Sequence, residues 1–310
     1  MSNIWLLCDD SINFEESYNK LLVNLFKEEF GDDFEVINIE NVICCVSEDG
    51  LCVTDKEGNK IEVPRIVYFR IRNNISSNQI LNGIILLQFL ELLGSHIIDS
   101  IEGIKNCENK FIQLFLLKKA GLPVPKTVCG TNIEFENVIS HCDVGEKSII
   151  KSLYGSHGKY IFLSLNKFSL RNISGILNHK YLYLFQEYIE YSHGRSLRVN
   201  IINYKIYNVF LLEANNDQVQ SNIHGLWNEV LGEFPEAEEL ALKAAECMGL
   251  DIAGVDLLFK EDGSFVICEV NQNPCLACQN KDENGEEKNT KIVNDVLDVF
   301  KERLEILENK

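Results

Sequence analysis

The sequence lacks the features of a membrane-spanning or secreted chain. No run of about 18 apolar residues occurs, so we predict no transmembrane helix and no membrane partner. The N-terminus, MSNIWLLCDD, has no basic residues before its short apolar stretch and turns acidic at Asp9, which is not the pattern of a signal peptide. We interpret this stretch as a first β-strand and expect a cytoplasmic protein.

Basic residues are also scarce. The chain has 29 Lys and Arg against 47 Asp and Glu, a net charge of −18. A nucleic-acid groove needs a basic face that replaces counterions, so we expect no nucleic-acid partner. An acidic surface aids solubility, and it leaves a cationic partner open as the second interpretation.

The eleven cysteines form no complete metal or disulfide pattern. They are scattered through mostly apolar segments, where cysteine behaves as a small hydrophobic residue, and without a secretion signal we expect a reducing compartment. Cys275 and Cys278 make a CxxC, but no second CxxC or histidine pair completes a zinc site. A structural role is the preferred interpretation of this pair.

Patterns along the chain predict an α/β (α+β) protein with three domains, 1–100, 101–189 and 190–310. The first domain alternates strands and helices: strand 3–9, helix 14–29, strand 34–40, hairpin 49–63, strand 64–71 and helix 78–93. The second contains helix 105–119, which ends at Gly121, then strands 147–153 and 159–165 and helix 168–179. The third is mostly antiparallel over 195–273, with helix 236–248, a solvated loop at 281–291 and a final helix.

Two carboxylates interrupt apolar strands in GVDLLFKEDGSFVICEVNQN, residues 254–273. A two-residue turn at Asp262–Gly263 is a strong hairpin signal, and it places Phe259 opposite Val266 and Asp256 opposite Glu269. Carboxylates directly opposite each other repel and weaken a sheet. We therefore expect something to offset the repulsion, and a divalent cation is the usual answer.

Asn271 extends this pair into an oxygen-rich site. It lies two residues after Glu269, so both side chains point to the same face of the sheet. Magnesium suits such a site, because it takes one or two carboxylates and completes its octahedron with phosphate oxygens and water. The alternatives are a slipped register that turns one carboxylate to solvent, or a protonated carboxyl group.

Weaker signals suggest a nucleotide site. Lys151 ends an apolar strand just before the glycine-rich stretch YGSHGK, 154–159, where backbone N–H groups can approach phosphate oxygens. The stretch is no Walker A motif, and a plain turn is the commoner explanation. Arg198 lies inside the apolar strand SLRVNII, and a buried arginine almost always has an anionic partner. Lys110, near a helix start, has simple solvation as its default interpretation.

The order of these motifs resembles the ATP-grasp superfamily, and within it the RimK-like carboxylate–amine ligases. The resemblance runs from about residue 101 to the C-terminus and is carried by NCENKFIQLFLLKKAGLPVP, IIKSLYGSHGKYI, FQEYI, SLRV, SNIH, GVDLL and CEVNQNP. It implies an ATP-grasp fold with an N-terminal α/β lobe, a central small α+β lobe and a C-terminal antiparallel-sheet lobe. ATP would lie between two antiparallel sheets, beneath a glycine-rich loop.

The resemblance also implies roles for single residues. Phosphate contacts are expected from Lys110 and Lys151, cover of the triphosphate from Gly155, Ser156 and Gly158, and nucleotide contacts from Gln186, Glu187, Tyr188, Ile189 and Ser196. Two Mg²⁺ ions, with Mn²⁺ as an alternative, are expected on Asp256, Glu269 and Asn271. Arg198 and Asn222 are the expected catalytic residues. Arg198 would stabilise the acyl phosphate and the tetrahedral intermediate, and Asn222 would assist with the same anion or with the metal.

Several positions depart from the pattern of the RimK-like ligases. Leu212 and Glu213 stand where that pattern has paired arginines that hold glutamate, and Gln220 replaces a further arginine. These losses argue against glutamate as the donor. Arg70 and Arg72, in YFRIRNN, are a candidate substitute clamp from the first domain, and solvated strand-end arginines are the alternative.

The implied function is an ATP-dependent carboxylate–amine ligase that forms an amide or peptide bond through an acyl phosphate. Its partners would be ATP, a carboxylate donor and an amine acceptor, and relatives imply a homo-oligomer, a dimer or a tetramer. One alternative is a peptide-modifying, macrocycle-forming ligase of the same superfamily that acts on a basic peptide. Another is a non-catalytic ATP-binding scaffold protein on the same fold.

Overall fold

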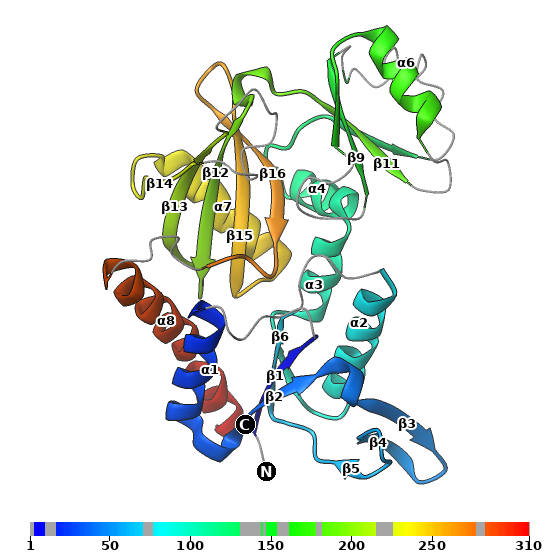
Figure 1. The fold of residues 1–310 in the computed structure, drawn as a ribbon, viewed down its shortest axis with the longest axis vertical. Coiled ribbons are helices and arrows are strands. Elements are labelled where there is room, and N and C mark those ends of the chain that lie inside the picture. The colour runs from blue at the N-terminus through cyan, green and yellow to red at the C-terminus, as the bar shows by residue number, and fades with distance from the viewer. Residues whose placement is uncertain are drawn as a thin grey trace.

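Four sheets organise the described part of the chain in the computed structural model (Figure 1). The structure describes residues 3–9, 17–70, 77–130, 144, 147–153, 161–177, 182–214, 226–276 and 283–309. Within these residues, no helix combines the length and the apolar character needed to cross a membrane.

The first sheet is parallel, with strand order β2-β1-β6-β7. Its elements are β1 (Ile4–Cys8), α1 (Ser17–Phe30), β2 (Phe34–Asn38), β6 (Ile66–Arg70), α2 (Ser77–Leu92) and β7 (His96–Ile98). Alternate residues of each strand point to opposite faces. Leu6 therefore packs with Leu22 of α1, whereas Leu7 packs with Leu87 of α2 on the other face. Helices on both faces explain why these strands are apolar throughout.

A small antiparallel sheet, β3-β4-β5, extends from this layer at the lower right of Figure 1. Its strands are β3 (Ile43–Ser47), β4 (Gly50–Thr54) and β5 (Lys60–Ile61). The predicted turns are present, with positive φ at Gly50 (109°) and Gly58 (86°). The strands β3 and β7 were not predicted: β7 has only three residues, and β3 is largely exposed.

The predicted helix 105–119 is wrong, because the chain forms two helices here. They are α3 (Ile101–Glu108) and α4 (Lys110–Lys119). Asn109 between them has an extended backbone, and its side chain accepts hydrogen bonds from the N–H groups of Phe111 and Ile112, both at 3.1 Å. This N-cap starts a new helix at Lys110. As predicted, Gly121 follows the end of α4 and has the positive φ (+83°) typical of a helix stop.

The central sheet is antiparallel, with strand order β10-β9-β11-β8. Its elements are β8 (Thr127–Gly130), β9 (Ser148–Ser152), β10 (Ile161–Ser164), α6 (Lys167–Ile176) and β11 (Tyr183–Glu187). Ile150 and Phe185 pack against Leu170 of α6. By alternation, Lys151 and Gln186 lie on the opposite face of the sheet, which α6 leaves uncovered.

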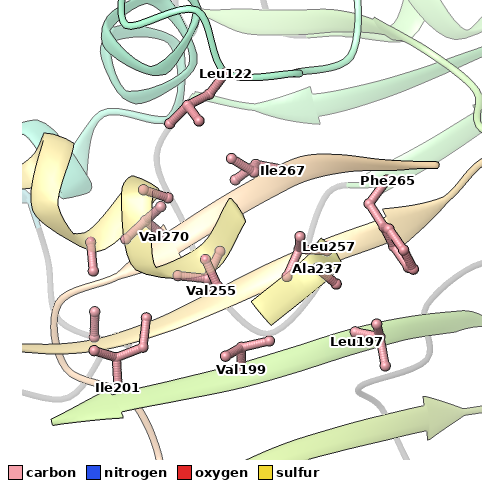
Figure 2. Close-up of a cluster of buried hydrophobic side chains, with 14 of the residues drawn as sticks. Leu122, Leu197, Val199, Ile201, Ala237, Val255, Leu257, Phe265, Ile267 and Val270 are labelled. Atoms are coloured by element: carbon pink, nitrogen blue, oxygen red, sulfur yellow. The ribbon is translucent and has the colours of Figure 1, made fainter. Parts of the chain in front are cut away.

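The C-terminal sheet has strand order β14-β13-β12-β15-β16. Its elements are β12 (Arg195–Ile202), β13 (Lys205–Glu213), β14 (Leu226–Glu229), α7 (Pro235–Met248), β15 (Ile252–Phe259) and β16 (Phe265–Asn271). One face packs on α7 through Leu197, Val199, Val255 and Leu257 (Figure 2). The helix meets this face with small residues such as Ala237, which are fully buried and allow close approach. The intervening strand residues, Asp256 among them, lie on the other face.

The predicted loop at 281–291 is also wrong, because α8 (Glu283–Glu308) runs through it. Its first turns are rich in Glu and Lys, which are good helix formers as well as loop residues. The helix lies beside α1 (Figure 1), and Phe300 meets Phe26 edge-on at a centroid distance of 4.9 Å. The end of the chain thus packs against the first layer. The division at 100 and 189 stays a proposal.

Candidate active site

The two predicted carboxylates stand directly opposite each other. Asp256 on β15 pairs with Glu269 on β16, and Gly254 pairs with Asn271. The three polar side chains therefore share the face of the sheet that α7 does not cover. A slipped register, one of the alternatives considered, does not occur.

The route to this pairing differs from the prediction. Lys260 N–H donates to the Ser264 carbonyl (2.9 Å), and Gly263, with φ +83°, donates to the Lys260 carbonyl (3.1 Å). The turn is thus one residue longer than expected, and Phe259 faces Phe265. A β-bulge after Asp256 then adds one residue to β16 and restores the predicted pair.

Each carboxylate is paired with a cationic side chain from another element. The Arg198 guanidinium on β12 holds Asp256 with two hydrogen bonds, Nε–Oδ1 at 2.5 Å and Nη2–Oδ2 at 2.7 Å. Lys110 at the start of α4 forms an ion pair with Glu269. In the protein itself, these two cations offset the repulsion for which the sequence suggested a metal ion.

Electrostatics keep this cluster charged. Burial works to raise the pKa of Glu269, but Lys110, Lys151 and Arg198 outweigh it and lower the pKa below the ordinary value. Burial likewise works to lower the pKa of Lys110, and the Glu269 carboxylate outweighs it and raises the pKa. A protonated Glu269, the other alternative considered, is therefore not favoured at neutral pH.

Asn271 completes a set of hard oxygen ligands. Its Nδ2 donates to Oδ2 of Asp256 (3.3 Å) and to the carbonyl of Gly254 (3.4 Å), which fixes the orientation of the amide group. The described residues contain no group of three His, Cys, Asp or Glu side chains suited to a metal ion. Two carboxylates and one amide oxygen nevertheless fit magnesium, which takes its remaining ligands from phosphate and water.

Gly254 keeps the polar face closely packed. A Cβ at this position would lie 2.7 Å from Cβ of Pro274 and 3.1 Å from Oδ1 of Asn200. Asn200 is fully buried, and its Nδ2 donates to the Cys275 carbonyl at 3.5 Å. Glycine therefore lets the segment after β16 lie against β12 and β15 beside the carboxylates.

Gln113 is a positioning residue that the sequence reasoning missed. It is fully buried in α4, where its Oε1 accepts from the Val270 N–H (2.7 Å) and its Nε2 donates to the Val270 carbonyl (2.8 Å). These bonds hold the edge strand β16 against α4, so Lys110 and Glu269 stay together. A glutamine one residue before buried Leu114 and four residues before buried Leu117, on the same face of the helical pattern, was the available signal.

The expected nucleotide contacts lie on the central sheet and just beyond it. Lys151 is buried on β9, and its charge acts on the pKa of Glu269. The Gln186 side chain donates to Oγ1 of Thr127 (2.8 Å), and the Glu187 N–H donates to the Lys126 carbonyl (2.9 Å).

The segment after β11 continues these contacts. The Tyr188 N–H donates to the Lys147 carbonyl at 3.3 Å. No hydrogen bond from the Ile189 N–H is found within the residues that the structure describes.

Some expected residues cannot be placed. Gly155, Ser156, Gly158, Asn222, Gln220 and Arg72 lie outside the described residues. Ser196 is buried on β12, two residues before Arg198 and on the same face. Leu212, at the position of a missing arginine, is fully buried on β13.

Comparisons with known proteins agree with this geometry. Residues 107–296 match the RimK-like ATP-grasp domain family. The chain is 28% identical over 279 residues to β-citrylglutamate synthase B of Homo sapiens. The aligned region covers 88% of this chain and 71% of that protein.

Two solved structures are similar in fold. A RimK domain ATP-grasp protein of Sphaerobacter thermophilus has a TM-score of 0.67 at 15% identity and covers 96% of this chain and 98% of that one. The ATP-grasp ligase PsnB, solved with a variant of its minimal precursor, Mg and ADP, has a TM-score of 0.62 at 18% identity, with the same coverage of 96% and 98%. With the family match, these findings show that the chain belongs to the RimK-like ATP-grasp family and is an ATP-dependent carboxylate–amine ligase.

Proposed function

We propose that the chain joins a carboxylate donor to an amine acceptor on the polar face of the C-terminal sheet. The observation that carries this proposal is the cluster of Asp256, Glu269 and Asn271. Lys110 and Arg198 pair with its two carboxylates. The cluster offers oxygen ligands for a metal ion and cations for phosphate within one small area.

The nucleotide would lie between the central and C-terminal sheets. We assign Lys110 and Lys151 to its phosphates, because one lies beside Glu269 and the other is close enough to lower the pKa of Glu269. The Ile189 N–H would donate to the adenine edge, with the neighbouring backbone of Glu187. Gln186 and Tyr188 would support this segment, and Ser196 would face the ribose. The loop of Gly155, Ser156 and Gly158 would cover the triphosphate.

Asp256, Glu269 and Asn271 would hold two Mg²⁺ ions, with Mn²⁺ as an alternative. When bound, such ions neutralise phosphate charge and align the reacting oxygens. The ligands suit this task, because all three offer oxygen and the Asn271 amide is held in place by Asp256.

The proposed reaction has two steps. A donor carboxylate oxygen attacks the γ-phosphorus of ATP, the bond to the leaving oxygen breaks, and ADP and an acyl phosphate result. The amine then attacks the acyl carbon, loses a proton, and phosphate leaves. Arg198 is the proposed stabiliser of the acyl phosphate and the tetrahedral oxyanion, because its planar fork of donors fits such oxygens. Asn222 would assist it.

The substrates belong to the part of the proposal that the family does not fix. The name of β-citrylglutamate synthase describes a citryl group joined to glutamate. We infer a comparable reaction class for this chain, an acyl donor joined to an amino acid. Buried Leu212 and half-buried Glu213 argue against an arginine clamp for glutamate on β13.

Oxygen transfer tests the acyl phosphate directly. The protein is incubated with ATP, Mg²⁺, amino acids and a panel of carboxylates labelled with ¹⁸O. We expect ADP and phosphate as products, with one ¹⁸O in the phosphate of each turnover. Label in AMP would indicate an acyl adenylate instead. ATP binding without stimulation by any carboxylate would favour the scaffold interpretation.

A peptide substrate is the second candidate, favoured by the net charge of −18, which would attract a basic peptide. PsnB, similar in fold, was solved with its minimal precursor. Phosphate release stimulated by basic peptides, and not by amino acids, would support this candidate. A cytoplasmic homo-oligomer, dimer or tetramer, completes the proposal, and sedimentation of the full chain tests the oligomeric state.

A further inference from the structure

Arg70 stands at the point of the first sheet where open α/β folds bind ligands. The chain runs from β1 outward to β2 and from β6 outward to β7, so the strand order reverses between β1 and β6. The helices that follow these strands, α1 and α2, cover opposite faces. Ligands of such sheets bind beyond the carboxyl ends of the strands at this reversal. Arg70 is the last residue of β6 and pairs with Cys8, the last residue of β1.

Arg70 is buried and incompletely bonded. Arg70 is 8% exposed, and its Nη1 donates to the Tyr68 hydroxyl at 3.0 Å. Its Nε and the nearby Tyr18 hydroxyl are both buried without a hydrogen-bonding partner. The guanidinium lies 5.8 Å from the Tyr18 ring centroid and 5.6 Å from that of Tyr68. The predicted alternative of a solvated arginine is wrong for this residue.

Arg70 also has no carboxylate partner within the residues that the structure describes. Burial raises the pKa of both Tyr18 and Tyr68, so these phenols stay neutral and supply no counter-charge. Asp99 lies close enough for Arg70 to lower its pKa, but burial outweighs this and raises the pKa well above the ordinary value, which favours the neutral carboxyl group. Its Oδ1 accepts from the N–H groups of Asp251 (2.7 Å) and Ile252 (2.9 Å). A buried guanidinium without a counter-ion is costly, and proteins retain one where a ligand supplies the anion.

The segment after β16 connects Arg70 to the site of the chemistry. The segment begins beside Arg198, because a Cβ added to Gly254 would lie 2.7 Å from Cβ of Pro274 and 3.4 Å from Cδ of Arg198. The Cys275 carbonyl is bonded to Asn200 on the polar face, and the next residue, Leu276, packs in one cluster with Tyr18 and Tyr68. A small molecule placed beside Cys275 would thus lie between two cations.

We propose that Arg70 binds a second carboxylate of the donor, the one that does not react, while the first is activated near Arg198. Nε and Nη2 form the edge of the guanidinium that holds a carboxylate through two parallel hydrogen bonds. The Tyr18 hydroxyl is a further donor to the same oxygens. The donor is therefore a dicarboxylate or a larger polycarboxylate. This inference rests on the proposed ligase function and adds the substrate class to it.

Matched carboxylates test this inference without knowledge of the acceptor. Hydroxylamine serves as the amine, because it converts any acyl phosphate to a hydroxamate with release of phosphate. Succinate is compared with butyrate, and glutarate with pentanoate, as donors for the wild-type protein. We expect kcat/KM to favour the dicarboxylate by about 10- to 100-fold, the range for hydrogen bonds to a charged group. Equal use of both members of each pair would overturn the inference.

Two variants test whether Arg70 causes the preference for dicarboxylates. Arg70→Met should remove the preference for dicarboxylates to within about threefold, because both charge-assisted donors are lost. Arg65→Met is the matched control, since Arg65 directly precedes β6, at the opposite end of the same strand, and pairs with Glu308. It should keep the preference. Arg70→Met should also melt no lower than the wild type, because it removes an unpaired buried charge. A large drop in melting temperature would indicate a structural arginine and contradict the inference.

The results separate the two levels of the argument. Hydroxamate formed equally from mono- and dicarboxylates, with no effect of Arg70→Met, overturns the role of Arg70 and leaves the ligase function intact. If no carboxylate of the panel gives hydroxamate or phosphate although ATP and Mg²⁺ bind, both the inference and the proposed function are wrong.

Discussion

The Lys110–Glu269 ion pair predicts that Glu269→Gln destabilises the protein, whereas the sequence alone predicts the opposite. From the sequence, Glu269→Gln removes one of two facing carboxylates and should relieve repulsion. In the structure, the same change leaves the ammonium of Lys110 without its partner. The side chains of Lys110 and Glu269 are 16% and 27% exposed, so the pair is largely withdrawn from solvent.

The magnitude follows from this burial. Relief of like charges across a strand pair is worth at most about 1 kcal/mol. Removing one partner of a fully buried pair costs about 3–5 kcal/mol, and exposed pairs contribute about 0–1 kcal/mol. For this pair we expect Glu269→Gln to lower the free energy of unfolding by about 2 kcal/mol at pH 7, between those limits. Turnover should be abolished in the same variant.

A double-mutant cycle with Lys110→Met isolates the pair. Denaturant unfolding of the two single variants and the double variant should give a coupling energy of about 1–2 kcal/mol. Lys105 and Glu102 form an exposed pair of the same chemistry on α3 and serve as the control cycle, with a coupling energy near zero. A Glu269→Gln variant as stable as the wild type would refute the reasoning.

The pH dependence provides a second check. The pKa of Glu269 is lowered in the folded protein, so its contribution to stability is present above the ordinary carboxyl pKa of 4.5. It is lost as the pH falls through the lower folded pKa. The stability gap between the wild type and Glu269→Gln should therefore persist from pH 7 to about 4.5 and close below it. A gap that stays constant at acid pH would contradict the assignment.

Three further variants test the parts around this pair. Gly254→Ala places a Cβ 2.7 Å from Cβ of Pro274 and should lower the free energy of unfolding by about 1–3 kcal/mol in denaturant titrations. Gln113→Leu leaves the N–H and C=O of Val270 without their side-chain partners and should cost about 2–3 kcal/mol by the same measurement. Lys151→Met removes a proposed phosphate ligand and should raise the KM for ATP by about 10- to 100-fold, whereas an unchanged KM would exclude that role.

Each of these variants has a matched control in the same chain. Gly175→Ala lies in α6, where an added Cβ would meet nothing within 4 Å, so it should not lower stability. Gln88→Leu and Lys118→Met lie on exposed helix surfaces and should change the measured values little. Equal effects in the variants and their controls would show that the contacts described here do not cause them.

The hairpin shows why part of the site was predictable. The turn was predicted one residue too short, yet Asp256 still faces Glu269, because a bulge in β16 restores the register. Without that bulge, a one-residue shift would turn Glu269 into the apolar face against α7, while Asp256 would stay opposite Arg198. Burial of one face thus constrains the register more strongly than the turn does. The alternation of apolar and polar residues therefore indicates the register of the strands, whereas the exact turn type does not.

The rest of the site depends on contacts between distant parts of the chain. Arg198 reaches Asp256 across 58 residues, and Lys110 reaches Glu269 across 159. The local sequence pattern indicated each of these residues as a site candidate, but it did not indicate which residue each one would contact. The break at Asn109 and the helix through 281–291 were missed for a related reason, since composition alone does not distinguish a helix cap from a helix interior or a charged helix from a loop.

The cations of the site differ in what they can offer to a substrate. Lys110 and Arg198 already hold carboxylates of the protein, so phosphate or acyl oxygens reach them only by exchange with Glu269 and Asp256. Such exchange suits the charged, transient groups of the reaction, because each of them replaces a carboxylate of the protein with another anion. Within the residues that the structure describes, Arg70 holds no carboxylate, and its Nε is buried beside Tyr18 without a hydrogen-bonding partner. A preformed cation suits a group that stays unchanged during the reaction, because it contributes binding without a competing partner. Donor choice would therefore lie with the first domain, and activation with the C-terminal sheet.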